Sequence, residues 1–226
     1  LKINKLIVLS LILLILFTVS AVSAEKNITN ITSNGDLLTS ESSNEHLNKV
    51  AGDSDLLTSD SPNANFNDLN KGINESTNEL KLTHDYVYND INFTDGINVS
   101  KSNFLLDGNG YSIDGNGKAR IFNIIGNNVT LKNLIIKNAL NGAVSFVQPN
   151  AEYYLDNVTI QNSSSKYASG GIELNATNLV VNNSKFISNT GTKSSDIFFN
   201  EKCNVIVVNS TFEGGIESKW SHIYFS

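Results

Sequence analysis

Two identical tetrapeptides, Asp107-Gly-Asn-Gly110 and Asp114-Gly-Asn-Gly117, have residue types and a spacing that could do chemistry. Aspartate and asparagine beside glycine can supply oxygen ligands on a tight loop, so a calcium site has to be weighed. The pattern matches neither the nonapeptide calcium repeat nor the calcium loop between two helices. Two turns flanking a short strand, Tyr111–Ile113, explain the same residues. We therefore predict no metal site and no cofactor.

Catalysis would need ionisable side chains gathered in one cleft. Polysaccharide lyases and hydrolases use paired carboxylates, or a base beside acidic calcium ligands. Arg120 is the only arginine, and His46, His84 and His222 lie far apart in the sequence. We expect no enzyme and name no catalytic residue. The alternative to a non-enzymatic role is a carbohydrate-active enzyme, either a lyase or a hydrolase.

A repeat supplies the elements that would position any such side chains. Four similar phrases of eight residues have central asparagines at steps of 24, 26 and 26, namely Asn133, Asn157, Asn183 and Asn209. An apolar column stands eleven positions earlier, at Phe122, Phe146, Ile172 and Phe198. A polar column that suits tight corners stands five positions earlier, at Asn128, Glu152, Asn178 and Asn204.

Units of about 25 residues with alternating apolar positions are too small to close their own core, so they must stack on one another. The sequence therefore predicts an all-β fold, a parallel β-helix or solenoid. With coils roughly 4.8 Å apart, the four asparagines would form a ladder in which each amide bonds to the next. We expect this ladder to point inward and to be structural rather than a binding site.

The same register tests for stacked acidic residues. The column just before the ladder is Lys132, Asp156, Asn182 and Val208. Two positions after the ladder stand Ile135, Thr159, Lys185 and Thr211, and four positions after it stand Lys137, Gln161, Ile187 and Glu213. None of these columns places two acids on adjacent coils, and Asp156 beside Lys132 is interpreted as a surface ion pair.

The first 24 residues are typical of a secretory signal peptide. Lys2 and Lys5 precede an apolar run, and Val22–Ala24 resembles a cleavage site. An uncleaved membrane anchor is the alternative, although the run is shorter than the roughly 20 residues that a span needs. Residues 25–65 are polar and read as a disordered linker. We expect a secreted or cell-surface protein.

The spacing of Phe66, Leu69 and Ile73 predicts a short helix over residues 66–80, with Asn67 as its cap. This helix would cover the first coil of a β-helix that occupies residues 81–226. The segments 195–200 and 221–226 align at a step of 26. Because the last coil is then incomplete, we expect a truncated chain whose association with the cell envelope depends on a missing C-terminal part.

Composition limits the kinds of partner that the protein could bind and the covalent modifications that it could carry. The net charge of −6 gives no support for nucleic-acid binding. Cys203 is the only cysteine, which predicts a buried small residue and no internal disulfide. Eleven Asn-X-Ser/Thr sequons occur. Glycans are plausible at corners and in the linker, but would not fit at Asn157 and Asn209 if the ladder points inward.

The segment 106–124, followed by Asn128–Leu134 and further asparagine-marked coils, resembles the adhesin-like surface proteins of methanogenic archaea. The resemblance covers about residues 66–225. It implies a signal peptide, a polar spacer, a cap and a right-handed parallel β-helix of the pectate-lyase-like class, often followed by further repeats and an anchor.

The expected function is that of an exported, adhesin-like cell-surface β-solenoid. It would present a binding face to glycans or surface proteins of host or neighbouring cells. Outward side chains and the longer corner loops would make the contacts, at 138–143, 163–171 and 189–195. A pectate-lyase-like enzyme is one alternative, and a passive envelope component or a non-functional fragment is another.

Overall fold

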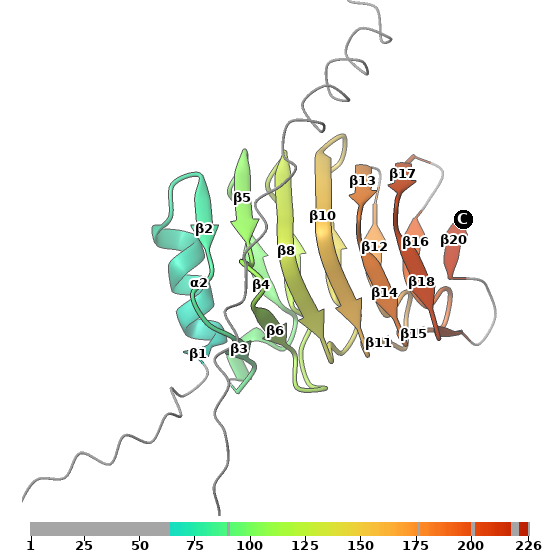
Figure 1. The fold of residues 1–226 in the computed structure, drawn as a ribbon, viewed down its shortest axis with the longest axis horizontal. Helices are drawn as coiled ribbons and strands as arrows, with labels where there is room; N and C mark the ends of the chain where they lie inside the picture. Colours follow the sequence, from blue (N-terminus) through green and yellow to red (C-terminus); the bar gives the residue numbers. More distant parts are fainter. Residues whose placement is uncertain (1–63, 90, 176, 200–201, 218–221, 226) are drawn as a thin grey trace, which may run out of the picture. The chain divides into compact units, whose positions relative to one another are not determined.

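Stacked parallel strands form almost all of the regular structure. The computed structural model describes residues 64–89, 91–175, 177–199, 202–217 and 222–225. These residues belong to one compact unit (Figure 1). The predicted signal peptide and most of the predicted linker lie outside the described residues. The last two linker residues form a strand, β1 (Ala64–Asn65).

The strands form three sheets. The eleven-stranded large sheet contains β1, β2 (Glu79–Lys81), β3 (Tyr86–Val87), β5 (Phe104–Asp107), β6 (Ser112–Asp114), β8 (Val129–Lys137), β10 (Glu152–Gln161), β13 (Asn178–Asn182), β14 (Lys185–Ile187), β17 (Asn204–Val208) and β18 (Thr211–Glu213). The six-stranded sheet contains β4 (Ile97–Val99), β7 (Phe122–Ile124), β9 (Val144–Phe146), β12 (Ile172–Leu174), β16 (Ile197–Phe199) and β20 (Ile223–Phe225). The small sheet contains β11 (Ser164–Ser165), β15 (Thr190–Gly191) and β19 (Ile216–Glu217).

Every pairing between these strands is parallel, and the register follows the repeat. Leu131 on β8 pairs with Leu155 on β10, which lies above Val181 on β13. Each coil of the described part contributes one strand to the six-stranded sheet, so this part has six coils. The predicted all-β parallel solenoid is thus confirmed. The right-handed winding stays a prediction.

The helix α2 (Phe66–Glu75) lies at one end of the stack, beside β2 (Figure 1). Its predicted apolar residues, Phe66, Leu69 and Ile73, are buried as expected. The predicted cap and end are wrong, however. Asn65 caps the helix, because its side chain accepts a hydrogen bond from the backbone N–H of Asp68, and the Asp68 carboxylate accepts one from the backbone N–H of Asn65.

A second short helix, 3-10 in type, spans Ile91–Phe93.

The helix ends at Glu75, and the predicted helical residues that follow include the start of strand β2. The ring of Phe66 packs edge-on against Tyr88, with the centroids 5.3 Å apart. The helix thereby buries apolar side chains against the core at the end of the stack, which is the covering role that the sequence predicts.

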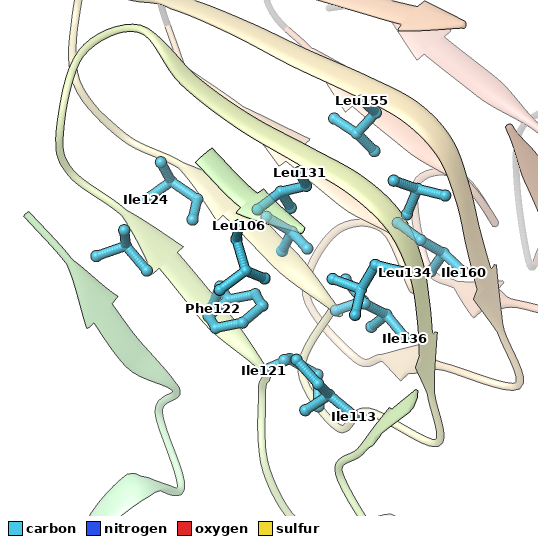
Figure 2. Close-up of a cluster of buried hydrophobic side chains, with 14 of the residues drawn as sticks. Leu106, Ile113, Ile121, Phe122, Ile124, Leu131, Leu134, Ile136, Leu155 and Ile160 are labelled. Carbon is cyan, nitrogen blue, oxygen red and sulfur yellow. The ribbon is translucent and has the colours of Figure 1, made fainter. Parts of the chain in front are cut away.

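The core consists of apolar stacks, in which side chains at the same position of successive coils lie above one another (Figure 2). Leu106, Leu131 and Leu155 form one such stack, and Ile136 with Ile160 belongs to another. On the last described coil, side chains such as Val205, Val207 and Phe212 are only partly buried. Cys203 is likewise half-buried against the core rather than fully buried.

The predicted apolar column needs correction. Phe122 pairs with Val144 and not with Phe146, which lies above Ile124 instead. The residue above Ile172 is Ile197 rather than Phe198. The connections between the six-stranded sheet and the large sheet differ in length from coil to coil, so a constant offset of eleven residues does not hold. The large sheet and the small sheet keep the register of the repeat.

The predicted corner column is right at one position. Asn128 has the left-handed backbone of a corner, with φ of 54°. Glu152, Asn178 and Asn204 instead begin the strands β10, β13 and β17. A second left-handed column was missed, at Asn138, Asn162, Ser188 and Gly214. It mixes three residue types, so no sequence pattern reveals it.

The four asparagines stack in the predicted register, but among the described residues only the amide of Asn157 bonds to the next asparagine, Asn133, and the predicted inward direction is wrong. Asn157 is exposed, and its backbone is left-handed with φ of 56°. The equivalent bend at Asn133 turns the chain so that two consecutive residues, Lys132 and Asn133, both lie outside the core. The ladder therefore lies on the outside of the solenoid. The burial argument against glycans at Asn157 and Asn209 fails with it, because both residues are exposed.

Candidate binding face

The outward residues at the beginning of the long strands form a continuous surface, which we call the outer face. It has three parallel columns. The first is Asn128, Glu152, Asn178 and Asn204; the middle is Leu105, Thr130, Tyr154, Val180 and Ile206; the third is Asp107, Lys132, Asp156, Asn182 and Val208. Because strands alternate, the residues between these columns point into the core.

A hollow of about 200 Å³ lies in the outer face. Its lining residues are Glu152, Tyr153, Tyr154, Asn178, Val180 and Asn204. The ring of Tyr153 is buried against Phe146, whereas Tyr154 on the outward side is 37% exposed. Apolar character continues along the middle column, because Ile206 on the last described coil is 46% exposed. The hollow therefore combines an aromatic side chain with polar groups on rigid strands.

Two amides in the hollow are available for a ligand. Within the described ranges, no residue hydrogen-bonds the side chains of Asn178 and Asn204. Earlier in the column the situation differs, because the amide of Asn128 donates to Oδ1 of Asn103 at 2.8 Å. The two free amides are direct neighbours in register, on β13 and β17. Each offers hydrogen-bond donors and an acceptor.

Glu152 gives the hollow a negative charge. Its carboxylate accepts a long hydrogen bond of 3.5 Å from the phenol of Tyr154. Burial, and secondly the charge of Glu152, raises the pKa of Tyr154 above its ordinary value of 10.0. No lysine or arginine lines the hollow. The nearby Lys132 on the third column is paired with Asp156, with 3.9 Å between Nζ and Oδ2.

The two Asp-Gly-Asn-Gly segments form equivalent turns. Oδ1 of Asp107 accepts from the backbone N–H of Asn109 at 2.9 Å, and Oδ1 of Asp114 accepts from that of Asn116 at 2.7 Å. The same carboxylates accept from amides on the next coil, those of Asn133 and Asn138 respectively. In the described part of the chain, no cluster of three or more His, Cys, Asp or Glu side chains could hold a metal ion.

The residues considered for catalysis do not converge. Arg120 donates to the backbone oxygen of Asn141 and to Oδ1 of Asn123, beside the six-stranded sheet. Its nearest carboxylate is that of Glu173, 3.9 Å away. On the outer face, Asp107 and Asp156 share a column but have Lys132 between them. His46 lies outside the described residues, and the ring of His84 packs against Tyr86.

One polar cluster was not anticipated. The fully buried carboxylate of Asp196 accepts from the amide of Asn189 at 2.8 Å and from the hydroxyl of Ser195 at 2.8 Å. Nδ1 of His222 lies 2.6 Å from Oδ2 of the same carboxylate. Both Ser195 and Asp196 contact the same ring nitrogen, so histidine cannot relay a proton between them as in a hydrolase triad. The step of 26 residues between segments 195–200 and 221–226 was the signal that places His222 beside Asp196.

The helices of the described part are too short and too polar to cross a membrane. No protein-family model matches the chain, and no curated protein and no solved structure matches it. The parallel pairing of the strands and the repeat in the sequence establish the solenoid.

Proposed function

We propose that the protein is an exported cell-surface β-solenoid that binds partners on other cells through its outer face, without catalysing a reaction. The observation that carries the proposal is the hollow, in which the exposed Tyr154 lies beside the free amides of Asn178 and Asn204. Tyrosine is among the residues that most often dominate binding energy. The resemblance to adhesin-like surface proteins agrees with this role.

The architecture suits such a role for a physical reason. The lining residues begin three adjacent strands, β10, β13 and β17, which are held together by a regular parallel register. A site on paired strands loses little conformational freedom when it binds, so more of the contact energy becomes affinity. The face also spans several coils, which offers an extended partner repeated contacts.

The arrangement of charges supports binding over catalysis. Glycoside hydrolysis needs two carboxylates flanking one bond. The acids of the third column, Asp107 and Asp156, are separated by the ammonium group of Lys132, which pairs with Asp156. Glu152 has no acidic partner among the residues that line the hollow.

The test compares two tyrosine variants of the labelled full chain on intact cells. Tyr154→Ala removes the exposed ring of the hollow. Tyr167→Ala removes a ring that is 75% exposed in the corner loop 163–171, a loop expected from the sequence to make contacts but placed outside the binding site when the outer face is the site. We expect Tyr154→Ala to weaken binding at least about tenfold and Tyr167→Ala to leave it unchanged. Equal binding by both variants, or no binding by the wild type, would overturn the proposal.

Export is tested separately, by fusing residues 1–24 to a reporter and measuring how much of the reporter leaves the cell. The expected result is export that depends on the basic start and the apolar run. A control fusion carries Leu13→Asp, which interrupts the apolar run. Retention of the unaltered fusion inside the cell would contradict the proposed location.

A further inference from the structure

We propose that the hollow recognises an uncharged saccharide and discriminates against saccharides that carry carboxylates. This inference rests on the proposed binding function and adds the class of ligand. Three properties of the hollow carry it: the outward side chains Tyr154 and Val180 of the middle column, two free amides, and a single unbalanced carboxylate. The same properties disfavour the acidic polysaccharides on which a pectate-lyase-like enzyme would act.

The apolar residues of the middle column match the non-polar side of a sugar ring. Tyr154, Val180 and Ile206 occupy the same outward position on three successive coils. These coils lie roughly 4.8 Å apart, which is of the order of the size of one sugar ring. A saccharide laid across the strands therefore meets one apolar side chain per coil, with its C–H groups packed against the ring of Tyr154.

The free amides match the hydroxyl groups. A sugar hydroxyl both donates and accepts hydrogen bonds, and so does the side chain of each asparagine. Asn178 and Asn204 are adjacent in register, so two hydroxyls on neighbouring carbons or neighbouring sugars can be engaged together. Since both amides are open to the ligand, no protein hydrogen bond with a described residue has to be broken.

The backbone argues against an extended peptide as the ligand. A peptide that adds a strand needs a sheet edge with unpaired N–H and C=O groups. The hollow lies on the surface of the sheet, where β10 pairs with β8 and β13 on its two sides. The strand β13 is likewise paired on both sides, with β10 and β17. Among the described residues β17 is an edge strand, but a peptide added to that edge would lie beside the hollow and not in it.

The negative charge of Glu152 favours neutral saccharides over those that carry a carboxylate. Glu152 is the only lining residue that is negatively charged at neutral pH, and no cation lines the hollow to balance it. A hydroxyl can donate to this carboxylate, whereas a uronate carboxylate is repelled by it. Because Glu152 is exposed, the repulsion is modest, and we expect about a three- to fivefold lower affinity for the uronate.

The experiment is titration calorimetry of the full chain with matched pairs of short oligosaccharides. Each pair has one linkage and one length, and differs only in the oxidation of C6: glucose and glucuronate, galactose and galacturonate, mannose and mannuronate. We expect at least one neutral member to bind, and its uronate partner to bind about three- to fivefold more weakly, with a difference that shrinks as salt is added.

Two variants isolate the source of the discrimination. Glu152→Gln keeps the size and the hydrogen-bond acceptor, and should bind both members of the pair equally. Glu79→Gln removes the same charge from β2, where Glu79 pairs with Leu105 of the middle column. This position is three strands from β10 and roughly 14 Å from Tyr154, so the variant should behave as the wild type. Equal or tighter binding of the uronate by the wild type would overturn the inference, as would the lack of binding by every neutral oligosaccharide.

The cell-binding test separates this inference from the proposed function. Protease treatment of the target cells should leave Tyr154-dependent binding intact, and periodate oxidation of their sugars should remove it. If protease removes the binding and periodate does not, the partner is a protein: the saccharide inference falls and the proposed function stands. If no binding depends on Tyr154, the proposed function itself falls.

Discussion

The side-chain amide of Asn157 donates to Oδ1 of Asn133 on the preceding coil, over a distance of 2.9 Å. The amide of Asn133 in turn donates to Oδ1 of Asp107 at 3.1 Å. This chain of hydrogen bonds links three coils at the place where each strand bends. All four asparagines of the ladder have the left-handed backbone that asparagine tolerates; the side chain of Asn133 also uses its donor and its acceptor, and that of Asn157 its donor.

Substitutions at Asn157 separate these two contributions. Asn157→Gly keeps the left-handed backbone accessible and loses the hydrogen bond, so we expect a loss of about 1 kcal/mol in the free energy of unfolding. Asn157→Ala also adds backbone strain, for a further loss of about 1 to 2 kcal/mol. Urea denaturation of both variants measures the difference. If the Asn157→Ala variant is as stable as Asn157→Gly, the left-handed backbone is not the reason for asparagine at this position.

Glycine substitutions test the close packing of the first tetrapeptide turn. A Cβ on Gly108 would lie 2.5 Å from the backbone oxygen of Asn133 and 2.7 Å from Cα of Leu134, so something in the backbone must move. We expect Gly108→Ala to lower the free energy of unfolding by about 3 kcal/mol.

The control is Gly72→Ala in the interior of α2, where the added Cβ meets only the end of Leu80 at 3.5 Å. Alanine there should raise the free energy of unfolding by about 0.5 to 1 kcal/mol, because it restricts the unfolded chain and favours the helix. Opposite signs for the two glycines are the expected result in urea denaturation. A neutral Gly108→Ala would show that the turn can relax.

The buried Asp196 makes the last described coils sensitive to substitution. Asp196→Ala removes the partner of Asn189, Ser195 and His222 at once, and we expect a loss of about 3 to 5 kcal/mol. His222→Ala should cost less, about 1 to 3 kcal/mol, because the histidine side chain is 39% exposed and two donors to Asp196 remain.

The matched control for Asp196→Ala is Asp95→Ala, at an exposed position, where we expect a change within about 0.5 kcal/mol. Thermal or urea denaturation followed by circular dichroism measures all three variants. Equal costs at Asp95 and Asp196 would contradict the role given to the buried carboxylate.

The repeat made the large sheet predictable, because a step of 24 to 26 residues between similar phrases leaves one way to stack them. The columns at Lys132 and at Ile135 accordingly have the predicted register. The direction of Asn133 was not predictable from alternation, because the left-handed residue interrupts the alternation that the prediction assumed. The six-stranded sheet is shifted for another reason, since the connection 147–151, which follows Phe146, is longer than the connection 125–128 at the same place in the preceding coil.

The candidate site was less predictable than the fold. The column of Asn128, Glu152, Asn178 and Asn204 was identified in the sequence, but as a set of corners. That Asn128 is bonded to Asn103 while Asn178 is free depends on how neighbouring coils pair. Likewise, Tyr154 belongs to a surface only because its alternation places it outside while Tyr153 enters the core.

The phenol of Tyr154 should report directly on Glu152. Its pKa is raised, first by burial and then by the negative charge of Glu152. The folded protein therefore favours the neutral phenol, and this contribution to stability is complete below the ordinary pKa of 10.0 and is lost as the pH rises through the raised value. Removing the charge with Glu152→Gln should lower the pKa of Tyr154 without returning it to 10.0, because burial remains.

The measurement is an alkaline titration of tyrosinate absorbance, in which the difference between the wild type and Tyr154→Phe isolates this one tyrosine. That subtraction is needed because burial also raises the pKa of Tyr86 and Tyr153. In the Glu152→Gln background, the same difference should appear at lower pH, whereas Glu79→Gln should leave it in place. An unchanged titration in Glu152→Gln would mean that the carboxylate does not face the phenol in solution, and the charge-based selection proposed for the hollow would lose its physical basis.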